Sequence, residues 1–450
     1  MDKNKYFEKL VAEAHEKGVF TGTWLYAENG EAVSKGAVGR RDPEDRLPIL
    51  ESSVFDLASV SKQFTACAIM LLRRRGLLDL EDEITDFFPE IPYKGVTIRH
   101  LLNHTGGLPD YMDWVEKTAK AENTVPGNAV IVRFLCECGE APVFAPGEKY
   151  EYSNTGYCLL AQIVEEVSGV PFDDFLLRNV FEPAGMRSTR VIHRRMNGLT
   201  AEDLAYGMVL KDGKYILPDD AADLSSCVVP LDGMSGDGLV HSNIFDLLTW
   251  DRALREEKVL TAEEQEMMYT PGRLNDGSIA GEKGGHEQYG FGWEIINDPE
   301  LGLVVCHSGG WPGYSIWYER FIDADRVLIT LCCRSAADER GYDSFLKGMR
   351  DAARGKEPEP VRLLEDIAVG DPDRSGWAAL CGTYEWRTYV IEISMRDGDL
   401  YARFTSDDGN SDEERMYPLG EKTFGIKEES GDISFGEGSL SFYGTEGRKL

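Results

Sequence analysis

The sequence predicts an α+β fold: an antiparallel sheet built from two distant parts of the chain, a helical lobe inserted between them, and a small all-β module at the carboxy end. Three observations support this prediction. Strand patterns cover residues 20–38 and return in 289–333, helical periodicity dominates between them, and short alternating strands fill 374–450. We therefore assign residues 1–355 to a larger domain, 356–373 to a linker and 374–450 to a β-barrel or sandwich.

The amino-terminal elements are a helix and a hairpin. Residues 4–18 carry apolar side chains at helical spacing. The strand-like segments 20–26 and 32–38 flank Asn29-Gly30, a dipeptide that suits a type I′ turn. These features predict that the two segments pair as neighbouring antiparallel strands.

The middle of the chain is mostly helix and long loop. Residues 59–75 read as an apolar helix that ends before Gly76, a natural residue for the position after a helix. Helices are also expected near 155–168 and 242–256. The second group of strands and the last helix are expected at residues 289–296, 302–306, 314–321, 326–333 and 341–354.

The segment 356–373 is charged and shows little periodicity. Its run from Lys356 to Pro360 contains two prolines, which exclude a continuous helix. Beyond it, turns are expected at Asp397-Gly398, Asp408-Gly409 and Gly431-Asp432, between short strands.

Composition narrows the range of partners. The formal charge is −31, from 48 basic and 79 acidic residues, so the surface repels phosphate backbones and anionic lipids. No stretch approaches the ~20 apolar residues of a membrane span. We expect a small-molecule or short peptide substrate, no nucleic acid and no membrane; nothing in the sequence indicates an oligomeric state. The start of the chain shows no apolar leader segment, which predicts a cytoplasmic protein.

Cysteine and histidine spacing predicts no metal site. The nine cysteines contain no C-x-x-C pair, and the seven histidines show no H-E-x-x-H spacing. We expect the cysteines to be reduced core residues, and we expect no metal and no cofactor.

The run from Ser59 to Lys62 is an S-x-x-K motif at the start of an expected helix. Residues three apart share a helical face, so the lysine amine can reach the serine hydroxyl. A serine becomes a good nucleophile when a base takes its proton, and a lysine becomes that base when its pKa is lowered. A second S-x-x-K, Ser344 to Lys347, is interpreted as an ordinary solvated helix face.

Two further motifs decide in favour of Ser59. Tyr152-Ser153-Asn154 precedes an apolar helix, so the tyrosine can move protons while Asn154 holds the lysine or a substrate carbonyl. The run from His307 to Gly310 follows an apolar strand, and its small residues let a substrate backbone approach closely. Taken singly, each motif also fits a purely structural role: Asn154 as the cap of the next helix, and the run from His307 as a turn at the end of a strand.

With these three motifs in this order, the sequence resembles the penicillin-binding-protein and class C β-lactamase superfamily of serine hydrolases. Similar proteins carry S-x-x-K, then Y-x-N, then a triplet of Lys or His, Thr or Ser, and Gly. The resemblance covers about residues 20–340. Further matching stretches are Leu101–Leu108, Phe181–Met186 and Tyr289–Trp293.

The resemblance implies the β-lactamase/D,D-peptidase-like fold and an acyl-enzyme mechanism. Ser59 would attack a carbonyl, Lys62 and Tyr152 would move the protons, and either of the two could be the acylation base. The backbone N–H groups of Ser59 and Gly310 would form the oxyanion hole. The resemblance assigns substrate binding to Asn154, His307, Ser308 and Gly309.

One difference from the class C β-lactamase pattern bears on the substrate class. Class C β-lactamases carry lysine where this chain has His307, and histidine there resembles the D,D-peptidases, D-aminopeptidases and esterases of the superfamily. The leading interpretation is therefore a penicillin-binding hydrolase of D-amino-acid peptides or amides. The alternatives are an esterase or transacylase on small acyl esters, a weak β-lactamase, and a non-catalytic binding protein.

Overall fold

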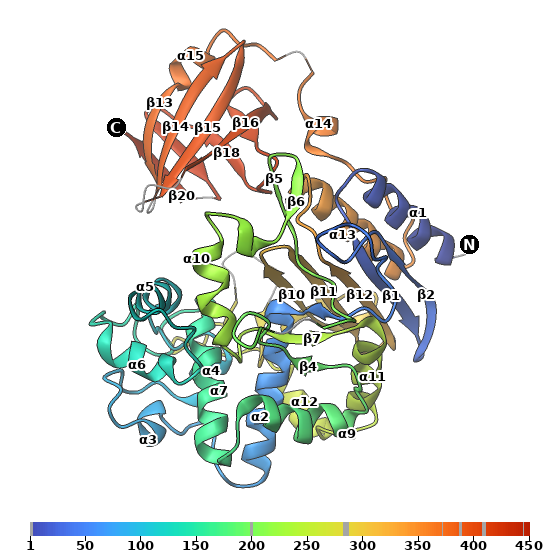
Figure 1. Ribbon diagram of the computed structural model, residues 1–450, viewed down its shortest axis with the longest axis vertical. Coiled ribbons are helices and arrows are strands. Elements are labelled where there is room, and N and C mark those ends of the chain that lie inside the picture. Colours follow the sequence, from blue (N-terminus) through green and yellow to red (C-terminus); the bar gives the residue numbers. More distant parts are fainter. Residues whose placement is uncertain are drawn as a thin grey trace. The chain divides into compact units, whose positions relative to one another are not determined.

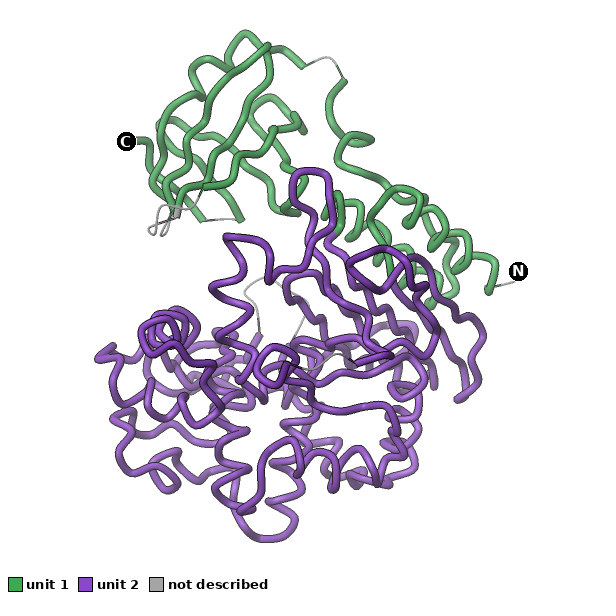
Figure 2. Tube along the Cα trace, in the orientation of Figure 1, with its two compact units in different colours: residues 1–21, 336–450 green, residues 22–335 purple. Residues whose placement is uncertain are grey.

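A computed structural model describes residues 3–198, 201–281, 288–370, 372–386, 389–406, 411–443 and 445–450. The chain divides into two compact units (Figures 1 and 2), residues 22–335 and residues 1–21 with 336–450. This division differs from the expected boundaries because the first and last helices of residues 1–355 group with the carboxy-terminal part. The boundaries at residues 355 and 373 stay predictions.

The unit of residues 22–335 is built on a seven-stranded sheet of order β2-β1-β12-β11-β10-β9-β8. Strands from the beginning of the chain therefore lie beside strands near residue 330, as the sequence predicted. Gly22 pairs with Cys332 and Glu28 with Arg326 across β1 and β12. The strands of the sheet are β1 (Gly22–Glu28), β2 (Glu31–Val38), β8 (Gln288–Tyr289), β9 (Glu294–Asp298), β10 (Gly302–Trp311), β11 (Tyr314–Phe321) and β12 (Arg326–Cys332).

The hairpin of β1 and β2 confirms the turn prediction. Asn29 and Gly30 both have positive φ, 51° and 81°, as a type I′ turn requires. The remaining short strands of this unit are β3 (Phe55–Asp56), β4 (Arg190–Val191), β5 (Val209–Lys211), β6 (Lys214–Ile216) and β7 (Val240–Ser242).

In the lobe between residues 62 and 184, α2 packs against α7. Helix α11 packs on β1 and β12. One contiguous apolar core joins the sheet and the lobe. The helices of this unit are η1 (Ala58–Ser61), α2 (Lys62–Arg74), α3 (Ile84–Phe87), α4 (Ile98–Leu102), α5 (Met112–Glu122), α6 (Val130–Glu137), α7 (Asn154–Ser168), α8 (Phe172–Leu176), η2 (Leu177–Phe181), α9 (Glu182–Ala184), η3 (Pro218–Asp220), α10 (Ser225–Val228), η4 (Pro230–Gly233), α11 (Ile244–Arg255) and α12 (Ala262–Met268).

Three elements differ from the expectations. The helix expected over 59–75 opens with the 3₁₀ turn η1 before α2 begins. The strand expected over 289–296 is broken, because Gly292 has φ 73° and Gly290 packs against the backbone of Met268. Strand β10 continues to Trp311, so the residues from His307 to Gly310 lie on an extended strand and not in a turn.

In the other unit, α1 (Lys3–Glu16) packs against α13 (Glu339–Ala353), and Phe20 lies 4.7 Å from Phe345 between ring centroids. The second S-x-x-K lies on α13, where Lys347 is exposed and pairs with Asp351 at 2.7 Å. The short helix α14 (Leu364–Ile367) interrupts the segment expected to be a linker.

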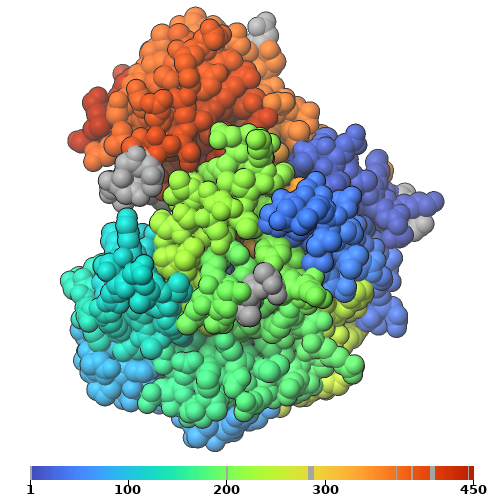
Figure 3. All heavy atoms as spheres, viewed as in Figure 1, coloured from blue at the N-terminus to red at the C-terminus, as the bar shows by residue number. Residues whose placement is uncertain are grey.

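The carboxy-terminal module is a closed eight-stranded barrel, whose outer surface is drawn in orange and red in the space-filling view (Figure 3). Its own apolar core includes Trp377, Ile391 and Leu440. The expected turn at Asp408-Gly409 lies outside the described residues. The elements are α15 (Trp377–Leu380), β13 (Gly382–Trp386), β14 (Tyr389–Arg396), β15 (Asp399–Ser406), β16 (Ser411–Pro418), β17 (Thr423–Gly425), β18 (Asp432–Phe435), β19 (Ser439–Phe442) and β20 (Thr445–Lys449).

All nine cysteines are free thiols. The expectation that they are core residues fails for Cys136, which is exposed on the lobe, and holds for Cys67, Cys158, Cys306 and the pair Cys332-Cys333. Among the described helices, none is long and apolar enough to cross a membrane.

Candidate active site

Ser59 lies on η1, at the point where the chain passes from β3 into α2. Its neighbour Ala58 has φ 45°, a left-handed conformation that costs energy for any residue with a Cβ. The backbone N–H of Ala58 donates to the carboxylate of Asp56 at 2.8 Å, which stabilises this conformation. Strain of this kind gathers at functional sites, and here it presents the Ser59 hydroxyl to a cavity.

The amine of Lys62 is completely buried and lies within hydrogen-bonding distance of three oxygens. It donates to Ser59 Oγ at 3.0 Å, to Asn154 Oδ1 at 2.8 Å and to the carbonyl oxygen of Asp237 at 2.9 Å. The spacing of the S-x-x-K motif therefore produces the contact that the sequence predicted. Because every oxygen is within 3.0 Å, the amine has one defined position.

Burial lowers the pKa of Lys62 from its ordinary value of 10.5 to about 8. Desolvation disfavours the charged amine, and the nearby carboxylate of Asp237 partly opposes this effect. An amine with this pKa is partly neutral near pH 7, so it can accept a proton from a serine hydroxyl.

Tyr152 and Asn154 lie where the loop before α7 meets the helix. Ser153 caps the helix by accepting the backbone N–H of Gly156, and its own N–H donates to Nδ1 of His104 at 3.0 Å. The ring of His104 packs on Tyr152 with centroids 4.3 Å apart. This loop therefore holds the Tyr152 ring, which lies 4.9 Å from Lys62 Nζ.

The environment of the Tyr152 hydroxyl favours its neutral form. Desolvation raises the pKa of Tyr152 well above its ordinary range, and a hydrogen bond with Ser59 acts in the opposite direction. The residue remains 40% exposed and lines a cavity beside Ser59. A neutral phenol in contact with Ser59 can donate a proton to an atom that leaves.

His307 lies on β10, is buried, and lines a cavity that Ser59 also lines. Its Nε2 is 2.8 Å from the hydroxyl of Tyr289, and its Nδ1 is 2.6 Å from the carbonyl oxygen of Ser308. Desolvation and the nearby Lys62 lower the pKa of His307 to about 3, so the ring is neutral. Tyr289 occupies one ring nitrogen, and the substrate-binding assignments of His307 and the exposed Ser308 stay predictions.

The two glycines that follow on β10 differ. A Cβ at Gly309 would lie 2.3 Å from the carbonyl oxygen of Leu57, so glycine is needed there for β10 to pack against η1. A Cβ at Gly310 would have no atom within 4 Å, which places open space in front of this residue. Strand β9 pairs with β10 only as far as Cys306, which leaves this stretch with one paired edge.

Sequence reasoning missed Asp237, although this residue contacts Lys62. It lies between Gly236 and Gly238, a pattern typical of an ordinary turn. Its buried carboxylate accepts the hydroxyl of Tyr111 at 3.0 Å, and desolvation raises its pKa. The only sequence signal was an acidic residue in an otherwise small and apolar stretch.

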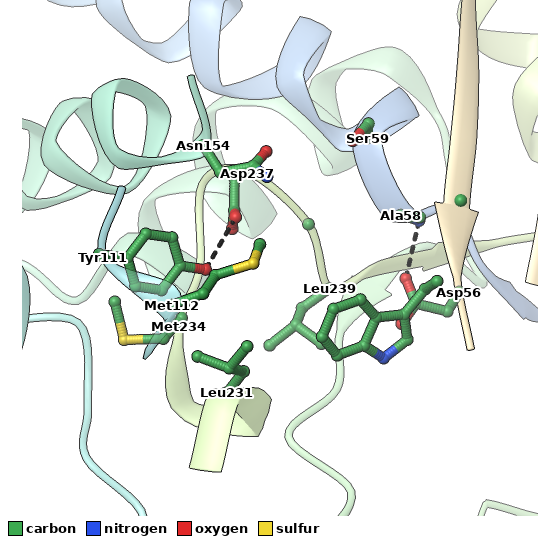
Figure 4. Close-up of a pocket in the computed structure, with 13 residues that line it drawn as sticks. Asp56, Ala58, Ser59, Tyr111, Met112, Asn154, Leu231, Met234, Asp237 and Leu239 are labelled. Carbon is green, nitrogen blue, oxygen red and sulfur yellow. Dashed lines mark hydrogen bonds between the residues drawn. The ribbon is translucent and has the colours of Figure 1, made fainter. Parts of the chain in front are cut away.

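Two cavities adjoin Ser59, and both are also lined by Gly310. The first, of about 80 Å³, is mostly apolar and lies under Ser59 and Asn154 in Figure 4. The second, of about 360 Å³, is lined by a mixture of polar and aromatic residues that includes Tyr152, His307 and Ser308. The structure thus brings all the candidate residues except Gly309 to the walls of these cavities or into contact with Lys62. In the described ranges, no cluster of three or more His, Cys, Asp or Glu could hold a metal ion.

Comparisons with known proteins identify relatives of this chain and solved structures with a similar fold. Penicillin-binding protein 4* of Bacillus subtilis is 42% identical over 332 residues, which cover 73% of this chain and 72% of that protein. A solved structure of the octameric penicillin-binding protein homologue from Pyrococcus abyssi covers 100% of both chains at 24% identity, with a TM-score of 0.66. The D-amino acid amidase from Ochrobactrum anthropi SV3, complexed with D-phenylalanine, covers 79% of this chain and 99% of its own at 24% identity and a TM-score of 0.64.

The likeness to these two solved structures shows that the chain has the β-lactamase-like fold that the sequence predicted. Residues 4–345 match the Beta-lactamase family, and this range contains all the candidate residues from Ser59 to Gly310. The chain therefore belongs to the beta-lactamase family of serine hydrolases, among its penicillin-binding relatives.

Proposed function

We propose that this protein is a penicillin-binding serine hydrolase that cleaves D-amino-acid-containing peptides or amides through an acyl-enzyme at Ser59. The observation that carries the proposal is the buried Lys62 amine, with a pKa of about 8, at 3.0 Å from Ser59 Oγ. A neutral amine at this distance is a suitable base for the serine hydroxyl.

In the proposed reaction, Ser59 Oγ attacks the carbonyl carbon while its proton passes to the neutral amine of Lys62. The N–H groups of Ser59 and Gly310 hold the developing oxyanion. The C–N bond then breaks as Tyr152 donates a proton to the leaving nitrogen. Water hydrolyses the acyl-enzyme along the reverse proton path and frees Ser59.

The choice of D-amino-acid substrates rests on two supports. His307 stands where class C β-lactamases carry lysine, and the relatives include a penicillin-binding protein and, in fold, a D-amino acid amidase. Esterase, transacylase and slow β-lactamase activities use the same groups and differ in the acyl group that fits.

The test is an intact-mass measurement after incubation with a penicillin, with Ser59→Ala in parallel. We expect one penicilloyl adduct on the native chain and none on the variant. Rates on D-amino-acid amides, their L-enantiomers and short esters then assign the substrate class. A native chain that gains no adduct and cleaves D-amides no faster than the variant contradicts the proposal.

A further inference from the structure

The two cavities on either side of Ser59 are not equivalent, and this difference extends the proposed function, on which it rests. Tyr152 lines only the larger cavity of mixed polarity, whereas Asn154 lines only the smaller, mostly apolar cavity. A general acid must reach the atom that leaves, so the leaving group occupies the side of Tyr152. The acyl group that stays on Ser59 then faces the apolar cavity.

The apolar cavity is walled by side chains from three separate segments. Figure 4 shows Tyr111, Met234, Leu231 and Leu239 around one space beneath Ser59. The apolar or aromatic residues that line it are Tyr111, Met112, Leu231, Met234, Leu239 and Trp311. Apolar area of this kind stabilises an apolar group that leaves water.

The carboxylates at the wall of this cavity already have partners. Asp56 accepts the backbone N–H of Ala58 at 2.8 Å, and Asp237 accepts the Tyr111 hydroxyl at 3.0 Å. Both residues are at most 9% exposed. Their bonding within the protein leaves the apolar side chains as the main surface offered to a substrate.

One wall residue has an unusual backbone. Leu239 has φ 67°, a left-handed conformation that a leucine rarely adopts. It connects the Asp237 loop to β7, and its side chain contributes to the cavity. Such backbone strain persists only where the surrounding structure holds the residue in place. The Leu239 side chain therefore has a defined position in the wall of this cavity.

The volume limits what fits. The cavity measures about 80 Å³, more than a methyl group needs and about half of the ~150 Å³ of an apolar cavity that admits benzene. A branched aliphatic side chain matches this volume, whereas an aromatic ring exceeds it.

We infer that Leu231, Met234 and Leu239 form a side-chain subsite that selects acyl residues of leucine or valine type over alanine and phenylalanine. The acyl donor is then a D-leucine-like amide or peptide and not the D-alanine of a minimal D,D-peptidase substrate.

The first experiment compares kcat/KM of the native protein on the p-nitroanilides of D-leucine, D-alanine and D-phenylalanine. Since one methylene in an apolar pocket changes rates by roughly 10–200-fold, we expect D-leucine to exceed D-alanine by at least about tenfold. We expect D-phenylalanine to react more slowly than D-leucine. A rate on D-alanine equal to that on D-leucine overturns the subsite.

The second experiment widens the subsite. Met234→Ala should lower the preference for D-leucine over D-alanine severalfold and raise the relative rate on D-phenylalanine. The matched control is Met196→Ala, because Met196 is 47% exposed and does not line the cavity. Hydrolysis of p-nitrophenyl acetate checks that each variant is folded, because the acyl methyl group of this ester does not need the subsite. If Met234→Ala does not fold, Leu231→Ala is used in its place.

Ester substrates test the subsite separately from the proposed activity on D-amino-acid substrates. If no D-amide is cleaved, but p-nitrophenyl isovalerate reacts faster than acetate and Met234→Ala removes this difference, the D-amino-acid proposal fails and the subsite stands. A ratio that Met234→Ala leaves unchanged, in a variant that still hydrolyses acetate, overturns the subsite alone.

Discussion

Lys62 has three acceptors around its amine, and this number matters for its protonation. The charged amine carries three hydrogens, one for each of Ser59, Asn154 and Asp237. The neutral amine carries two hydrogens and one lone pair. With two carbonyl oxygens that only accept, the lone pair of the neutral amine is left for the Ser59 hydroxyl, which can then donate to it.

The first prediction concerns pH. Acylation of Ser59 should rise as pH rises through about 8, the pKa of Lys62, and level off above it, because only the neutral amine accepts the proton. His307, with a pKa of about 3, stays uncharged throughout this range, and the pKa of His104 also lies well below its ordinary value. Burial raises the pKa values of Tyr152 and Cys158 above their ordinary ones, so they titrate later. Stopped-flow acylation by a chromogenic cephalosporin measures the midpoint, and a rate independent of pH between 6 and 10 would contradict this assignment.

Asp237 is a positioning residue, and its charge supplies the second prediction. The carboxylate raises the pKa of Lys62, so Asp237→Asn should move the midpoint of the acylation profile below 8. The control Tyr111→Phe removes the donor to Asp237 but keeps the charge, and its midpoint should stay near 8. A merely structural role would change rates without moving the midpoint.

At the scale of elements, the site depends on how β10 meets η1. These two elements pack together, and Gly309 is the place where the strand backbone comes closest to Leu57. Gly310, the next residue, faces open space. Gly309 therefore allows β10 to pack closely against η1, and Gly310 leaves room for a substrate in front of the strand.

This contrast gives the third prediction, a matched pair. Gly309→Ala should destabilise the fold by about 1–3 kcal/mol or more, because its Cβ would overlap the Leu57 carbonyl oxygen. Gly310→Ala should leave stability within about 0.5 kcal/mol and lower kcat/KM, because its methyl group projects into the cleft. Thermal melts and acylation rates measure both quantities. Equal losses of stability in the two variants would show that Gly310 also packs against the fold.

The sequence predicts elements well where local chemistry decides. The Asn29-Gly30 turn, the helix before Gly76 and the placement of Ser59 beside Lys62 follow from turn preference and helical spacing. The break between β8 and β9 depends on contacts with residues far away in the chain. The contribution of Asp237 has the same origin, because its closeness to Lys62 exists only once the loop is folded.

At the scale of the whole molecule, the candidate residues all belong to the unit of residues 22–335. The barrel has a separate apolar core. The grouping of α1 and α13 with the barrel could not be read from the sequence, because it depends on contacts such as the pairing of Arg340 with Asp432 at 2.6 Å.

Separate cores give the fourth prediction. Ile391→Ala in the barrel should lower one thermal transition, by about 2–5 kcal/mol of unfolding free energy, and leave Ser59 acylation unchanged. The matched change Ile69→Ala, in α2, should lower the other transition. Calorimetry and intact mass record the two effects. Slower acylation in Ile391→Ala would show that the barrel contributes to the reaction.

The pairing of β1 with β12 has a consequence for how the protein is made. Gly22 meets its partner Cys332 about 310 positions later in the chain. At a synthesis rate of ~5–20 residues per second, β1 waits on the order of 15–60 s for that partner. During this time the buried strand Gly22–Glu28 has only β2 beside it. A hairpin whose buried strand has an unpaired edge is therefore a natural client for a chaperone that binds nascent chains.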